Sequence, residues 1–144
     1  MSRGNTRVSV KLAVVAALVC LGSFTAAVLA ANAHFVSGPT ITAGGRNVTA
    51  CGKIAGLGNN ENVTVVLTAT GRTTCTNRGG NVPPGQTETV DGSAQVFSDE
   101  NGQVSFCVTT RSVSNPCPSS MTPRTTFSDF SVRVYDANGN QILP

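Results

Sequence analysis

Histidine, tryptophan and tyrosine are almost missing from this chain of 144 residues, which has one His, no Trp and one Tyr. One histidine excludes metal sites built from several imidazoles and leaves His34 as the only imidazole base for a hydroxyl nucleophile. No G-x-S-x-G motif is present. Aromatic residues that stack on sugars in glycosidase clefts are equally scarce. These absences argue against an enzyme, and we expect neither a catalytic residue nor a cofactor.

Charged residues are also few, at 12% of the chain, and the net charge of +3 comes from the N-terminus. Arg3, Arg7 and Lys11 all precede the first acidic residue, Glu61. Residues 34–144 carry seven Lys or Arg and seven Asp or Glu, a balance of zero. Nucleic-acid and anionic-lipid proteins are strongly basic, so neither partner is expected.

The first 33 residues have the features of a secretory signal peptide. Three basic residues precede the stretch Leu12–Ala31, which has no charge, and Ala31–Asn32–Ala33 fits the small-x-small cleavage pattern. Cleavage there makes His34 the new N-terminus, and Cys20 is then part of the signal. A retained membrane anchor is the alternative, because about 20 apolar residues can span a bilayer. We therefore expect a secreted, extracellular protein with a signal peptide at 1–33, one domain at 34–144 and no membrane span after cleavage.

Four cysteines remain after position 33, an even number in a small exported domain, which predicts two disulfides. They are Cys51, Cys75, Cys107 and Cys117. A zinc site is disfavoured because no pair has C-x-x-C spacing and no histidine is near. Cys51 and Cys107 are out of phase with the apolar residues around them, which argues against a bond across the core. Of the three possible connectivities we favour Cys51–Cys75 and Cys107–Cys117.

Beyond residue 34 the hydrophobic pattern has a period of two rather than 3.6. Apolar and polar residues alternate clearly in three segments, as in half-buried strands, and less clearly in five others. The pattern predicts an all-β fold, a single immunoglobulin-like antiparallel β-sandwich of 7–8 strands. The clear segments are 62–70, 102–110 and 129–135; the others are 40–43, 47–54, 72–77, 88–90 and 94–98. Gly71 is expected to end one strand before the next.

Two long irregular connections are predicted at Asn77–Gly85 and Ser112–Thr126, which are rich in glycine or proline. A rigid sandwich presents binding residues on such loops. Arg78, Arg111 and Arg124 lie on or beside them and are our candidate binding residues, against the alternative that they serve only solubility.

Other chemistry-bearing groups give weaker hypotheses. An N-terminal His34 offers an imidazole and an α-amine to copper, although the second histidine of such sites is missing. Asp136, Asn138 and Asn140 have the spacing that begins an EF-hand, but Gln141 stands where glycine is required, so a hairpin turn is favoured. Asn47 and Asn62 stand in N-x-T acceptor patterns for glycosylation.

The segment Ser98–Thr110, a turn with Asn-Gly leading into an alternating strand, resembles bacterial immunoglobulin-like modules of the invasin and intimin type. Lys53–Gly58 followed by Asn62–Thr70 resembles the strand-turn-strand opening of those modules. The same features are similar to the neocarzinostatin group of secreted chromophore carriers, although the cysteine spacing departs from theirs. His34–Thr40 also resembles small exported bacterial proteins with no assigned function. The resemblance implies a fold more than an activity.

These observations favour a small secreted, non-enzymatic β-sandwich that acts in extracellular binding or in surface or structural assembly. Its partner would be an extracellular protein, a glycan or a second copy of the chain. One alternative is a carrier of a small apolar ligand in a cleft lined by phenylalanines, namely Phe35, Phe97, Phe127 or Phe130. The other is the copper site at His34.

Overall fold

Alternating apolar and polar residues form seven β-strands in the computed structural model, which describes residues 32–144. The expected signal peptide thus lies almost wholly outside the described residues. No helix that could cross a membrane occurs between residues 32 and 144. The strands are β1 (His34–Gly44), β2 (Asn47–Ala55), β3 (Asn62–Thr76), β4 (Gln86–Phe97), β5 (Val104–Thr109), β6 (Thr122–Tyr135) and β7 (Gln141–Leu143).

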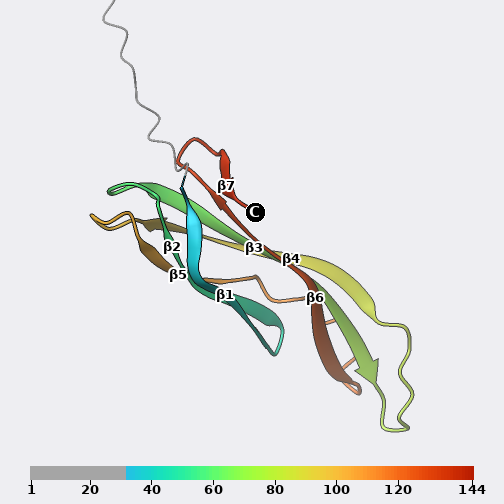
Figure 1. Ribbon diagram of the computed structural model, residues 1–144. Coiled ribbons are helices and arrows are strands. Elements are labelled where there is room, and N and C mark those ends of the chain that lie inside the picture. Colours follow the sequence, from blue (N-terminus) through green and yellow to red (C-terminus); the bar gives the residue numbers. More distant parts are fainter. Residues whose placement is uncertain (1–31) are drawn as a thin grey trace, which may run out of the picture.

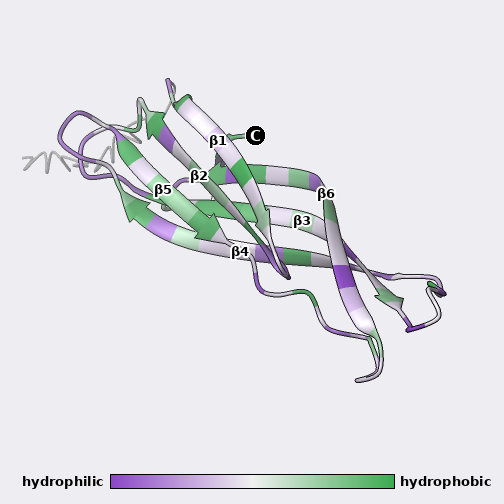
Figure 2. Ribbon diagram, turned by 90° about the horizontal axis from the view of Figure 1, so that it is seen from below, coloured by the Kyte–Doolittle hydropathy of each residue, from purple (hydrophilic) through white to green (hydrophobic). Residues whose placement is uncertain are grey.

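The strands form two antiparallel sheets, with the order β1-β2-β5 in one and β4-β3-β6-β7 in the other (Figure 1). The expected all-β sandwich with two disulfides is therefore confirmed. Along β3, every second residue from Val63 to Thr73 is buried and the residues between them are partly or fully exposed. Figure 2 shows the same alternation as bands of apolar and polar residues along the strands.

The core lies between the sheets and is built mostly from valine, leucine and isoleucine. Each such side chain contributes about 1.5–3 kcal/mol when fully buried. The buried apolar cluster comprises Val48, Ala50, Ile54, Leu57, Val63, Val65, Leu67, Ala69, Val90, Phe106, Val108, Val113, Val132, Val134 and Leu143.

Gly71 does not end a strand, contrary to expectation, because β3 continues through it to Thr76. A Cβ at Gly71 would lie 2.5 Å from the Val113 side chain and 3.1 Å from the Phe127 ring. Glycine here makes room for two core residues instead of making a turn. The two segments expected at 88–90 and 94–98 likewise form a single strand, β4. The connection expected at 112–126 is shorter than predicted, because β6 already begins at Thr122.

The four-stranded sheet is longer than the sheet that faces it, so the ends of β3, β4 and β6 project beyond the sandwich (Figure 1). We call this projection, residues 72–87 and 117–126, the distal tip. The β5–β6 connection lies against the four-stranded sheet where the distal tip begins, next to Gly71 of β3. There the side chain of Val113 is 2% exposed, and its carbonyl accepts a hydrogen bond of 2.8 Å from Arg46 Nε.

The disulfides join Cys51 to Cys107 and Cys75 to Cys117, so the favoured connectivity was wrong. Cys51 and Cys107 do face away from the core, as their phase indicated. They stand directly opposite each other on β2 and β5, with Cα atoms 4.1 Å apart. Two outward-facing residues in one cross-strand pair can bond without crossing the core. Their spacing in the sequence does not reveal that β2 and β5 are neighbours.

Candidate functional site

The Arg111 side chain is held against strand β4 by contacts within the domain. Its guanidinium contacts the Glu88 carboxylate and the Thr89 carbonyl, and its Nε lies 3.6 Å from an Asp91 carboxylate oxygen. The other Glu88 oxygen accepts a hydrogen bond of 2.9 Å from the Ser114 amide. These contacts attach the start of the β5–β6 connection to β4. Arg111, one of the three candidate arginines, therefore has a structural role.

The hydrogen bonds from Arg111 and from the Ser114 amide lower the pKa of Glu88 from 4.5 to about 2. A carboxyl whose folded-state pKa is depressed stabilises the fold above its unfolded pKa, and this contribution disappears as the pH falls toward the folded value. We predict that Glu88→Gln lowers the free energy of unfolding at neutral pH. The difference from the unmodified protein should vanish as the pH falls from about 4.5 to about 2.

Urea unfolding monitored by circular dichroism across that pH range measures this difference. Glu100→Gln, in the exposed β4–β5 turn, is the matched control and should show a small difference that varies little with pH. An unfolding difference for Glu88→Gln that stays constant down to pH about 2 would contradict the assignment.

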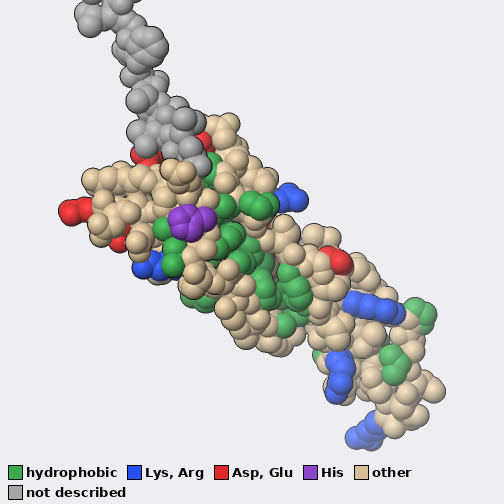
Figure 3. All heavy atoms as spheres, viewed as in Figure 1, with side chains coloured by type: hydrophobic (Ala, Val, Ile, Leu, Met, Phe, Trp, Pro, Cys, Tyr) green, Lys and Arg blue, Asp and Glu red, His purple; other side chains and the backbone are tan. Residues whose placement is uncertain are grey.

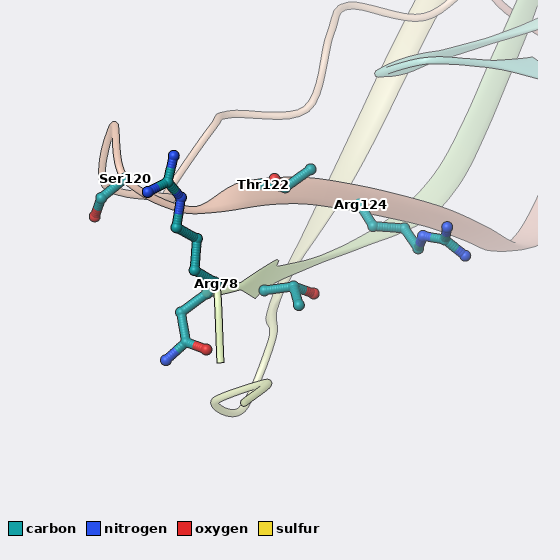
Figure 4. A pocket seen from close by; sticks show the side chains of 6 residues that line it. Arg78, Ser120, Thr122 and Arg124 are labelled. Carbon is teal, nitrogen blue, oxygen red and sulfur yellow. The ribbon is translucent and has the colours of Figure 1, made fainter. Parts of the chain in front are cut away.

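Arg78 and Arg124 line one open pocket at the distal tip, with a volume of about 380 Å³. The rest of the lining is neutral and polar: Thr76, Asn77, Ser120 and Thr122. Figure 4 shows the Arg78 side chain extending toward Ser120, whereas the Arg124 guanidinium lies at the opposite end of the group. The pocket therefore offers two separated cationic groups with hydroxyl and amide donors and acceptors between them.

Strand register and one disulfide hold this pocket together. Thr76 on β3 is opposite Thr122 on β6, and Thr74 is opposite Arg124. The Cys75–Cys117 bond ties the β5–β6 connection to the last residues of β3. In the β3–β4 loop, the Asn77 side chain accepts a hydrogen bond of 2.9 Å from the Asn81 amide. The lining residues thus come from two segments that are distant in sequence, 76–78 and 120–124, each made of a strand end and the adjoining loop.

A third arginine, Arg72, belongs to the same surface and was missed by the sequence analysis. It lies opposite Thr126 and two residues before Thr74, so it shares the outer face of the sheet with Arg124. Basic side chains gather on the projecting end of the molecule in Figure 3. The signal that could have found it is the absence of Asp and Glu from residues 62–87 and 101–128, the two stretches that supply the tip.

The phenylalanines proposed for an apolar cleft do not surround one cavity. Phe97 is opposite Asn62 and Phe127 is opposite Gly71, nine residues apart along β3, or about 30 Å. Phe35 and Phe106 both belong to the three-stranded sheet, where their ring centroids are 6.2 Å apart. Phe97 and Phe130 are exposed. These four phenylalanines therefore do not line one cleft together, and the carrier alternative remains a prediction.

His34 lies exposed at the start of β1, and its Nδ1 is 2.7 Å from the Asn32 carbonyl oxygen. No group of three metal-ligating side chains of the His, Cys, Asp or Glu type occurs within residues 32–144. The copper hypothesis at His34 remains a prediction.

The carboxylate of Asp136 belongs to a turn. It accepts hydrogen bonds of 2.8 Å from the backbone amides of Asn138 and Asn140, and one of 2.9 Å from the Asn140 side chain. Its pKa is lowered mainly by the two hydrogen bonds from Asn140. The hairpin interpretation of this segment accounts for the contacts. The acceptor asparagines Asn47 and Asn62 are both half-buried at strand starts.

Neither the family models nor the curated proteins nor the solved structures with which the chain was compared include a match.

Proposed function

We propose that the chain is an exported, non-enzymatic binding module that contacts an anionic extracellular ligand through its distal tip. The observation that carries this proposal is the open pocket with Arg78 and Arg124 at its ends and no carboxylate in its lining. Arginine presents a planar fork of donors that matches carboxylate, sulfate and phosphate oxygens. Ion pairs are observed in the described residues only at Arg111, so Arg78 and Arg124 remain available for a ligand.

Export and an immunoglobulin-like fold are part of the same proposal. Two disulfides are compatible with an oxidising compartment, and a signal peptide at 1–33 would deliver the chain there. Two facing antiparallel sheets of three and four strands support the immunoglobulin-like assignment. In such sandwiches the loops at one end commonly form the binding surface.

Binding is favoured over structural assembly because both edges of the four-stranded sheet carry features that hinder pairing with another strand. On β4, the Asp91 carbonyl accepts from the Arg111 amide and the Thr89 carbonyl accepts from the Arg111 side chain. On β6, most of one edge is left open by the short β7, but it carries Pro123 and a bulge where Asp129 has a φ of 52°. Prolines and bulges on edge strands block strand addition.

The domain is therefore expected to be monomeric. Size-exclusion chromatography with light scattering on residues 34–144 should give the monomer mass at every concentration tested. A mass that rises with concentration toward a dimer or a larger species would instead favour the assembly role.

The proposal is tested by nuclear magnetic resonance titration of the ¹⁵N-labelled domain with sodium sulfate. Shift changes should concentrate on Arg78, Arg124 and the neighbouring pocket amides, and they should be lost in Arg78→Gln/Arg124→Gln. Lys53→Gln/Arg133→Gln removes the same charge away from the tip and should leave them unchanged. Shift changes spread over the whole surface, or none at the tip, would refute the proposal.

A further inference from the structure

We propose that the outer face of the distal tip binds an extended acidic polysaccharide, with Arg72, Arg124 and Arg78 engaging successive carboxylates. This inference rests on the proposed function and specifies the class of ligand.

The three arginines follow one direction along the tip. Arg72, the Thr74–Arg124 pair and the Thr76–Thr122 pair are successive outward positions on β3 and β6, and Arg78 follows two residues after the strand ends. Successive outward positions are about 7 Å apart along a strand, so residues 72 to 76 alone span about 13 Å. The arrangement is a line of cationic groups and not a ring around one point.

The separation of the guanidinium groups decides between a compact and an extended ligand. Arg78 and Arg124 point to different ends of the pocket in Figure 4, so a single phosphate or sulfate would contact only one of them well. A ligand with carboxylates spaced along a chain would engage both, and the second contact would then be intramolecular and cost less entropy.

The neutral side chains between the arginines favour a sugar polymer. Hydroxyls of Thr76, Thr122 and Ser120 and the Asn77 amide are donors and acceptors suited to sugar hydroxyls. Single-stranded nucleic acid needs aromatic platforms for its bases, and the pocket lining contains none. Anionic membranes are recognised by clusters of about 4–8 basic residues, more than the three arginines on this face.

Isothermal titration calorimetry with polygalacturonate tests the inference, and uncharged dextran is the control polymer. The unmodified domain should bind polygalacturonate, not dextran, and more weakly as salt is added. Arg72→Gln/Arg124→Gln should lower the affinity by about tenfold. Lys53→Gln/Arg133→Gln, which removes the same charge, should change it by less than about twofold. Thermal melts of both variants show whether the fold is preserved.

Absence of polygalacturonate binding at low salt would overturn the inference, as would equal affinities of the two double variants. Tip-dependent binding to vesicles of phosphatidylcholine and phosphatidylserine without binding to polygalacturonate would identify a membrane as the ligand. In each of these three cases the inference fails. A positive sulfate titration at the tip would then leave the proposed function intact, whereas a negative one would remove both proposals.

Discussion

Gly92→Ala is expected to destabilise the domain by about 3 kcal/mol or more, enough to leave a measurable fraction unfolded in mild denaturant. A Cβ at Gly92 would lie 2.2 Å from the Thr109 carbonyl oxygen and 2.9 Å from the Thr110 Cα. The obstacle is backbone, so no side-chain rotation can relieve it. Relief would require β4 and the end of β5 to move apart, which would open the sandwich where the two sheets approach each other.

Urea unfolding of the variant measures this effect, and Gly79→Ala is its matched control. A Cβ at Gly79 would meet only side-chain atoms, the nearest 3.4 Å away, so that substitution should be neutral or slightly stabilising. Equal unfolding midpoints for the two variants would show that β4 and β5 do not approach as closely as the structure has them.

Removal of the Cys75–Cys117 disulfide is expected to have the second large effect, and to affect binding as well as stability. The bond closes a sequence separation of 42 residues, for which the loss of chain entropy corresponds to about 4 kcal/mol of stability. Cys75→Ala/Cys117→Ala should lower the free energy of unfolding by about 2–4 kcal/mol. It should also weaken ligand binding at the tip, because Cys117 holds the connection that carries Ser120.

The other disulfide provides the comparison. Cys51→Ala/Cys107→Ala removes a bond of similar sequence separation, 56 residues. That bond lies in the three-stranded sheet, which contributes no residue to the tip. A similar loss of stability is expected, without a change in tip binding under conditions in which the variant remains folded. Calorimetric unfolding and the sulfate titration, applied to both double variants, measure the two properties separately. Equal binding losses in both would contradict a local role for the Cys75–Cys117 bond.

Local pattern was sufficient to predict the fold class and the strands with the clearest alternation, but not the bounds of every strand. Alternation along β3 follows from the geometry of a strand, which places successive side chains on opposite faces, and a half-buried sheet requires one face to be apolar. The same phase correctly indicated that Cys51 and Cys107 face away from the core. Such features depend on residues a few positions apart, so they can be predicted from the sequence alone.

Contacts between distant segments were decided only by the tertiary structure. Gly71 looked like a strand end, because its role depends on Val113 and Phe127, which lie more than 40 residues away along the chain. The disulfide pairing depended on which strands are neighbours. The sequence could not distinguish the three candidate arginines from one another, because the Glu88 partner of Arg111 is 23 residues away along the chain. The register of β3 with β6 places Arg72 and Arg124 on one face. Residues 34–144, whose charges balance, thereby form a domain with a basic tip, because folding brings together two stretches without acidic residues.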